Sequence, residues 1–138
     1  MKCHNCHKGT VTLLARPGRT APYKSIPNLL VPADLEIQTC DHCGEEWMTP
    51  EDATRIDAAM NSVYQQELLR RLRSVLPDAK EASRIERDLG LSRGYLSRLR
   101  KSTRPPNESL LAILALFRQH PSTLRQVEAF WQQPVQQQ

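Results

Sequence analysis

The pattern of apolar and polar positions changes near residue 50 and divides the chain into two halves. In the first half, prolines recur at five-residue intervals from Pro17 to Pro32, which excludes a helix there and keeps strands short. This half is therefore expected to be a small β-rich segment. Its predicted strands cover residues 10–15, 28–31 and 35–39.

From Thr49 onward, apolar residues recur at helical spacing. The run Thr49-Pro50-Glu51-Asp52 is typical of a helix start, with a capping hydroxyl, a proline in the first turn and acids at the positive end of the helix dipole. A long helix is predicted over residues 51–75, with a break near Asn61-Ser62 left open. Shorter helices are expected over residues 79–89, from Ser92 as the cap to about Lys101, from Asn107 as the cap to Gln119, and from Ser122 to about Gln132.

Composition is that of an ordinary soluble globular protein, with 39% hydrophobic and 25% charged residues among 138. No apolar run approaches the ~20 residues of a membrane helix, and the first residues lack the apolar core of a secretory signal. We therefore expect a cytoplasmic protein without a membrane partner.

Charge is distributed unevenly between the two halves. Residues 1–63 carry 6 Lys/Arg and 8 Asp/Glu, a net charge of −2, whereas residues 64–138 carry 13 and 7, a net charge of +6. Seven basic and only two acidic residues fall within residues 84–104. A basic segment of this kind is typical either of a nucleic-acid-binding surface or of a solvated helical face.

The four cysteines form two Cys-x-x-Cys pairs, Cys3/Cys6 and Cys40/Cys43. In a reducing compartment, paired cysteines indicate a metal site rather than disulfides. Two knuckles of this spacing supply the four thiolates of a closed tetrahedral site, so we predict one structural Zn²⁺ per chain. A β-rich segment this short needs such a cross-link to fold.

Iron in a rubredoxin-like site and a redox dithiol are the alternatives to zinc. His4, His7 and His42 adjoin the knuckles, but four cysteines already complete a tetrahedron and leave no open position for catalysis. The sequence also lacks a readable Ser/His/Asp set, a phosphate-binding loop or a carboxylate pair. We therefore do not expect an enzyme.

Residues 85–99 have the pattern of a helix, a tight glycine turn and a second helix, which predicts a helix-turn-helix. Apolar residues fall where the two helices must pack, and Gly90 suits a turn with positive φ. Arginines on the outer face of a short second helix fit the DNA major groove. The alternative is an ordinary αα-hairpin with a basic surface.

The predicted contacts with double-stranded DNA surround this second helix. Arg93 and Arg98 are the candidate base readers, whereas Tyr95 is expected either at the DNA backbone or in the core. The full set is Ser92, Arg93, Gly94, Tyr95, Ser97, Arg98, Lys101, Arg104, Arg84 and Arg87, of which Arg84, Arg87, Lys101 and Arg104 are expected at phosphates.

An apolar stripe marks the last predicted helix and consists of Leu124, Val127, Phe130 and Trp131. Little chain follows that could cover this stripe. We therefore expect a homodimer, which would place two helix-turn-helix elements on a palindromic operator.

These observations predict an α+β protein. A β-rich zinc-binding domain with four cysteine ligands precedes an all-α helix-turn-helix domain of the Xre or lambda-repressor-like class. The expected divisions are a zinc-binding domain over residues 1–48, a helical connector over 49–62, a DNA-binding and dimerisation domain over 63–132 and a polar tail over 133–138.

This combination resembles the MqsA/YgiT-type antitoxin family. The likeness is carried by the Met-Lys-Cys-x-x-Cys start, the second knuckle near residue 40 and the Xre-type helix-turn-helix, and it extends to about Val127. Further matching residues are Lys80-Glu81-Ala82-Ser83, Ser97-Arg98, Lys101, Pro106 and His120-Pro121. The resemblance implies a zinc domain that binds a ribonuclease toxin and a helical domain that dimerises on a palindrome and represses its operon.

In that family, an Asn and an Arg four residues apart on the second helix read bases. The Arg corresponds to Arg98, but the Asn corresponds to Gly94, which has no side chain. We therefore expect a different operator, with Arg93 or Tyr95 as the substitute reader. Residues 16–33 also depart from the family pattern, so toxin contacts cannot be carried over to them.

Two functions are consistent with the sequence. The first is a DNA-binding repressor that serves as the antitoxin of a type II toxin–antitoxin pair and autoregulates its operon. The alternative is a stand-alone Xre-type transcriptional regulator in which the zinc module is structural and no toxin partner exists.

Overall fold

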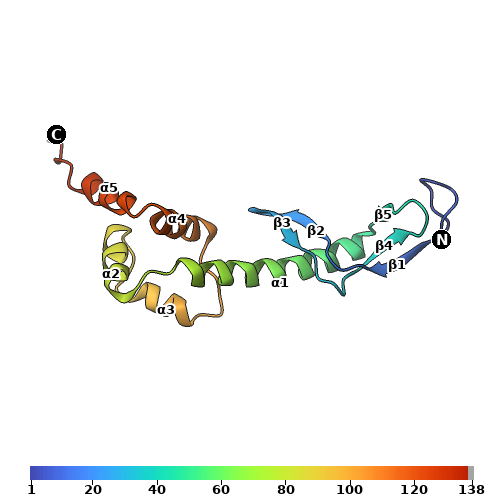
Figure 1. Cartoon of the computed structure of the whole chain (residues 1–138), viewed down its shortest axis with the longest axis horizontal. Helices are drawn as coiled ribbons and strands as arrows, with labels where there is room; N and C mark the ends of the chain where they lie inside the picture. Colours follow the sequence, from blue (N-terminus) through green and yellow to red (C-terminus); the bar gives the residue numbers. More distant parts are fainter. Residues whose placement is uncertain (137–138) are drawn as a thin grey trace. The chain divides into compact units, whose positions relative to one another are not determined.

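The computed structural model describes residues 1–136, which form five short strands followed by five helices, an α+β arrangement (Figure 1). The chain divides into two compact units, Met1–Tyr64 (unit 1) and Gln65–Gln138 (unit 2), and the division falls within α1. The strands are β1 (Val11–Ala15), β2 (Thr20–Tyr23), β3 (Ile26–Leu30), β4 (Glu36–Cys40) and β5 (Glu46–Trp47). The helices are α1 (Pro50–Val75), α2 (Ala79–Asp88), α3 (Tyr95–Lys101), α4 (Glu108–Gln119) and α5 (Ser122–Trp131).

Unit 1 contains two small antiparallel sheets (Figure 1). In the first, β4 lies between β1 and β5, and Val11 of β1 is opposite Cys40 of β4. In the second, β2 and β3 form a hairpin whose register shifts between Ala21 and Tyr23, on either side of Pro22. A proline cannot donate to a strand ladder, so an irregular two-stranded pairing accommodates it where a regular central strand would not.

The predicted strands correspond to β1, β3 and β4, displaced by one or two residues. β2 and β5 were not predicted. β2 contains a proline and alternates only weakly, and β5 has two residues, too few to show a period.

Contacts within unit 1 attach these strands to the first half of α1. The Gln38 side chain on β4 donates a hydrogen bond to Asp52 at 2.7 Å, and Arg55 donates to the Glu36 carbonyl at 2.6 Å. The Tyr23 ring of the hairpin meets the fully buried Tyr64 edge to face, with ring centroids 5.5 Å apart.

Helix α1 begins with a reciprocal cap, as the sequence predicts. The Thr49 hydroxyl accepts a hydrogen bond from the Asp52 N–H, and the Asp52 carboxylate accepts one from the Thr49 N–H, both at 3.1 Å. The possible break near Asn61-Ser62 is absent, and α1 runs unbroken to Val75. The reason is a buried stripe with one residue every fourth position, formed by Met60, Tyr64, Leu68 and Leu72.

Side-chain caps also fix two helices of unit 2. Asp78 caps α2 by accepting from the Glu81 N–H, and Asn107 caps α4 by accepting from the Leu110 N–H, both at 2.8 Å. α4 ends at Gln119, before His120-Pro121 as predicted. The buried core of this unit includes Leu72, Ile85, Leu96, Leu114 and Leu124.

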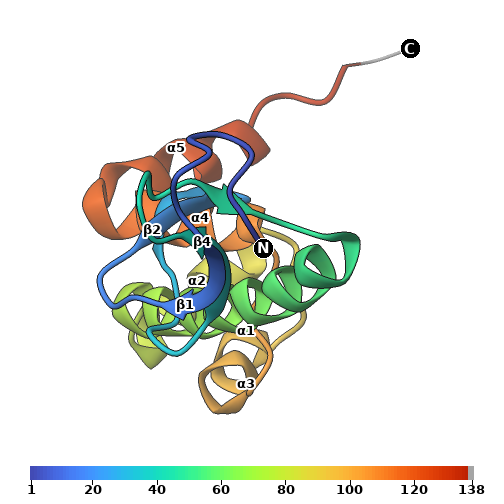
Figure 2. The same cartoon turned by 90° about the vertical axis from the view of Figure 1, so that its right-hand side faces the viewer.

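Within unit 2, α3 and α5 lie on opposite sides in both views (Figures 1 and 2).

After α5, residues 133–136 of the predicted polar tail form neither helix nor strand, and residues 137–138 lie outside the described part. Among the described residues, no helix combines the length and the apolar character needed to cross a membrane.

Candidate functional site

The sulfur atoms of Cys3, Cys6, Cys40 and Cys43 lie within 4.8 Å of one another. Cys3 Sγ and Cys43 Sγ are 3.7 Å apart, and so are Cys6 Sγ and Cys40 Sγ. A disulfide would require about 2.05 Å. For a Zn–S bond of about 2.3 Å, the edge of a tetrahedron of sulfurs is about 3.8 Å. The four sulfurs are therefore spaced as a tetrahedral metal site requires.

Strand pairing brings the two knuckles together. Because Val11 is opposite Cys40, the start of β1 lies beside the end of β4, where the second knuckle begins. The Cys3 N–H donates to the Gly9 carbonyl at 2.9 Å, and the Asp41 N–H donates to the Thr10 carbonyl at 3.1 Å. These bonds hold both knuckles to the same sheet end.

Backbone N–H groups point at the sulfurs in both knuckles. The Asn5 N–H lies 3.4 Å from Cys3 Sγ, and the His42 N–H lies 3.4 Å from Cys40 Sγ. In each knuckle, the residue after the second cysteine has positive φ, at 59° for His7 and 77° for Gly44. The two segments therefore adopt a similar turn that directs amides toward thiolates.

The pKa values of the cysteines are shifted in both directions, so the protein alone stabilises some of the thiolates and not others. The Lys8 N–H lowers the pKa of Cys6 to about 6 by hydrogen bonding to its thiolate. Amides of Cys43 and His42 act in the same direction on Cys40, but burial and the thiols of Cys3 and Cys43 raise its pKa to about 11. Four thiolates at this spacing require a cation among them, which fits a metal.

The three histidines near the knuckles are exposed, and within residues 1–136 the four-residue ligand group contains cysteines alone. The His4 ring lies edge to face against Trp47, with centroids 6.3 Å apart, and Trp47 packs on the cluster beside Val11. The histidines therefore belong to the surroundings of the cluster. All four tetrahedral positions are taken by sulfur, so the cluster suits a structural ion and leaves no place for a substrate.

The second candidate site begins with the turn between α2 and α3. Gly90 adopts φ 69°, its N–H donates to the Arg87 carbonyl at 3.3 Å, and the Leu91 N–H donates to the Glu86 carbonyl at 2.7 Å. This is a Schellman motif, in which glycine ends a helix and the chain reverses. The predicted role of Gly90 is confirmed by its positive φ.

A buried carboxylate joins α2 to the start of α3. Glu86 is 5% exposed, and its two oxygens accept from the Gly94 N–H at 3.1 Å and the Leu96 N–H at 2.8 Å. Glu86 thus supplies the N-terminal cap of α3 from the preceding helix. Sequence reasoning missed this role. The sequence offered one signal for it: Glu86 falls among the apolar positions of the helix expected over residues 79–89.

The prediction that Ser92 caps α3 is wrong. The helix begins at Tyr95 with Gly94 at the cap position, φ 82°, because Glu86 already satisfies the free N–H groups. The Ser92 hydroxyl instead accepts a hydrogen bond from Arg98 Nη2 at 2.9 Å. Ser92 therefore orients a side chain rather than a helix end.

The outer face of α3 is basic. Arg98 lies over Gly94, where an added Cβ would come 3.2 Å from Nη1, and Nη1 also donates to the Arg93 carbonyl at 3.2 Å. Tyr95 is half-buried. The other exposed members of the predicted contact set around α3 are Arg93, Ser97, Lys101 and Arg104.

The two arginines predicted on α2 differ in their surroundings. Arg84 donates through Nε to Glu128 of α5 at 3.1 Å, and this guanidinium lowers the pKa of the Glu128 carboxyl. Arg84 is thus directed toward α5 rather than toward α3. Arg87 is 71% exposed, with Nε 3.7 Å from Asp88.

The predicted dimerisation stripe separates into buried and exposed residues. Leu124 is 8% exposed and belongs to the core of unit 2, because α5 packs that side against α2 and α4. Phe130 and Trp131 remain exposed, at 57% and 64%, and Val127 is half-buried. The Trp131 indole donates to the Asp88 carbonyl at 2.7 Å, which fixes the end of α5.

Each unit therefore carries one arrangement with distinct chemistry: a closed four-sulfur cluster in unit 1 and a basic helix face on a buried cap in unit 2. Comparison with models of known protein families gives no match, and no curated protein matches the chain either.

Proposed function

We propose that this chain is a sequence-specific DNA-binding repressor that inserts α3 into the major groove as the second helix of a helix-turn-helix. The observation that carries this proposal is the Glu86 cap. A seven-residue helix has little stability of its own, and the cap fixes its start to α2 while its arginine-bearing face stays in solvent.

Arg98 is the proposed base reader. Ser92 and the Arg93 carbonyl hold its guanidinium over Gly94, which lowers the entropy lost on binding. A guanidinium has five N–H donors, so three remain while the turn holds it, enough for bidentate contact with guanine. Arg93 extends the base contacts, and Lys101 and Arg104 contact phosphates.

The metal is proposed to be Zn²⁺ in a structural role. Cys3, Cys6, Cys40 and Cys43 would hold it, and the ion would supply the cross-link that joins the two knuckles. Four thiolates and one divalent ion have a combined charge of −2, so the loaded unit 1 is acidic while unit 2 is basic. Iron in a rubredoxin-like site would use the same four thiolates, so metal content and colour distinguish the two ions. A colourless protein with one zinc per chain is the expected result.

The partner assignments follow from exposed apolar residues together with the resemblance to antitoxins. Phe130 and Trp131 supply the homodimer contact. In unit 1, Leu13, Leu30 and Met48 are 54%, 58% and 65% exposed, which suits an interface with a small toxin protein.

DNA binding is tested with the zinc-loaded full chain and the DNA upstream of its own coding sequence. Footprinting should reveal a protected palindrome, and Arg98→Ala should abolish the footprint at concentrations where the parent protein protects. The matched control is Arg125→Ala, an exposed arginine on α5, opposite α3. Equal loss in both variants, or no footprint for the parent protein, would overturn the proposal.

The antitoxin role is tested separately by co-expressing the tagged chain with each adjacent open reading frame. A small protein that co-purifies in stoichiometric amount and inhibits growth when expressed alone establishes the pair. A zinc-bound homodimer with no companion leaves a stand-alone regulator, the second function that the sequence allows.

A further inference from the structure

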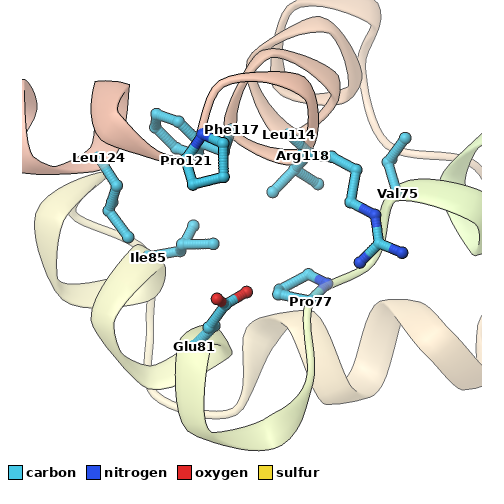
Figure 3. Close-up of a pocket in the computed structure, with 9 residues that line it drawn as sticks. All are labelled: Val75, Pro77, Glu81, Ile85, Leu114, Phe117, Arg118, Pro121 and Leu124. Carbon is cyan, nitrogen blue, oxygen red and sulfur yellow. The ribbon is translucent and has the colours of Figure 1, made fainter.

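We propose that unit 2 binds a small zwitterion with an apolar side chain, of the α-amino-acid class, in a cavity between α2, α4 and the start of α5 (Figure 3). This site is separate from the cysteine cluster and from the outer face of α3. Binding there does not depend on the proposed DNA function.

The cavity has the size and walls for one hydrocarbon group. Its volume is about 170 Å³. An engineered protein cavity of about 150 Å³ with Leu, Ile and Phe walls holds benzene, so this space accommodates a branched or small aromatic side chain. The apolar lining is Val75, Pro77, Ile85, Leu114, Phe117, Pro121 and Leu124.

Two opposite charges border the same space. Figure 3 shows the Glu81 carboxylate directed into the cavity from α2 and the Arg118 guanidinium along its side from α4. In the described part of the chain, neither of these exposed side chains forms a side-chain hydrogen bond or a salt bridge, although the Glu81 carboxylate acts electrostatically on Arg84, one turn along α2. Both groups are thus available to a ligand.

The chemistry of these groups selects the ligand. A carboxylate recognises an ammonium group, and a guanidinium recognises a carboxylate through two parallel hydrogen bonds. A free α-amino acid carries both groups beside an apolar side chain, which the cavity walls would remove from water. A ligand with one charge would satisfy only Glu81 or only Arg118.

The cavity also touches the helix that caps α3. Ile85 lines it, and the next residue is Glu86, which holds the start of α3. We expect occupancy to stabilise α2 at this point. An effect on DNA affinity would rest on the proposed function, whereas the binding site itself would not.

The test is methyl NMR of the zinc-loaded full chain without DNA, with labelled Ile and Leu, titrated with L-leucine. We expect saturable shifts of the Ile85 and Leu124 methyl signals. Isopentylamine lacks the carboxylate, 4-methylpentanoate lacks the ammonium group and glycine lacks the side chain, and each should bind roughly tenfold or more weakly.

Charge-removing variants pair with these analogues. Glu81→Gln should weaken L-leucine roughly tenfold and leave 4-methylpentanoate unchanged, whereas Arg118→Gln should weaken L-leucine and leave isopentylamine unchanged. Arg125→Gln, outside the cavity, is the control and should bind as the parent does. Equal binding of L-leucine and both analogues would mean a merely apolar cavity and would overturn the proposal. Absence of saturable shifts with L-leucine would overturn it as well.

Discussion

Gly9 lies so close to Cys40 that a Cβ atom on Gly9 would come 2.3 Å from the Cys40 sulfur. The same atom would meet Asp41 Oδ1 at 2.7 Å and His42 Cβ at 2.8 Å. No side chain fits at position 9, between the first knuckle and β1. The glycine is therefore required by the approach of the backbone to the sulfur cluster.

Gly9→Ala should displace Cys40 and lower the metal content of the purified protein. The expected result is well below one ion per chain, with a lower unfolding temperature of unit 1, measured by elemental analysis and thermal denaturation. Gly18→Ala is the control, because an added Cβ there meets nothing within 4 Å. That change should cost only about 1–2 kcal/mol, from its positive φ, and keep the metal. Full metal content in Gly9→Ala would contradict the geometry.

Removing the proposed metal ion should unfold unit 1 and spare most of unit 2. Unit 1 has little core besides its cysteine cluster and the residues facing α1, whereas unit 2 has its own capped helices. A strong chelator or Cys40→Ser should therefore change the amide NMR signals of the two units unequally. Collapse of unit 1 signals with retained α2–α5 signals is expected. Simultaneous loss of both sets would show a single cooperative unit.

Replacing Glu86 by Gln should loosen α3. A neutral amide offers one acceptor to two N–H donors, so either the Gly94 or the Leu96 N–H is left unpaired in a buried position. We expect a loss of about 1–3 kcal/mol in unfolding free energy, measured by urea denaturation. Faster amide exchange at Leu96 should accompany it. Lys80→Gln, at an exposed residue of the same helix, is the control and should change stability by less than about 0.5 kcal/mol.

Arg98 and Lys101 should affect DNA binding in different ways. Arg98→Ala should cost about 1–3 kcal/mol and relax the choice of base at one position of the selected site. Lys101→Ala should weaken all sequences about equally and reduce the salt slope by about one. Binding-site selection at two salt concentrations separates these results. A uniform loss with Arg98→Ala would make it a phosphate contact.

Phe130→Asp should convert the proposed homodimer to a monomer. The change places a charge in the exposed apolar surface that Phe130 forms with Trp131, and an unpaired charge at an interface is unfavourable. Concentration-dependent light scattering measures the mass. Leu13→Asp, at an exposed apolar residue of unit 1, should leave the dimer intact. A dimer that persists in Phe130→Asp would place the contact elsewhere.

Most of the helix starts could be predicted because the capping side chain directly precedes the helix in the sequence. Thr49 and Asn107 both cap as the sequence suggested. The start of α3 was wrong because its cap comes from Glu86, eight residues before Gly94 in the chain. A cap supplied from another helix depends on packing, and no nearest-neighbour pattern reveals it.

The sequence predicted the cysteine cluster, but it did not predict the surroundings of individual side chains in unit 2. The spacing of the cysteines alone indicated a cluster, because Cys-x-x-Cys restricts the knuckle geometry. The sequence could not show which element each arginine faces. Whether Arg84 faces α5 or the solvent depends on Glu128, 44 residues later. Likewise, Leu124 was expected on a dimer surface, and packing on α2 and α4 placed it in the core.

The pairing of Cys6 with Cys40 spans 34 residues, which has a consequence for the order of events during translation. At about 5–20 residues per second, the ribosome takes roughly 2 to 7 seconds to produce the second knuckle after the first. During that interval Cys3 and Cys6 lack the thiols of Cys40 and Cys43, and strand β4 does not yet lie beside β1. Closing a loop of this length also costs entropy before any sulfur contact is made. We therefore expect the newborn chain to be most vulnerable to oxidation, and to capture of the wrong metal, in the interval between synthesis of the two knuckles.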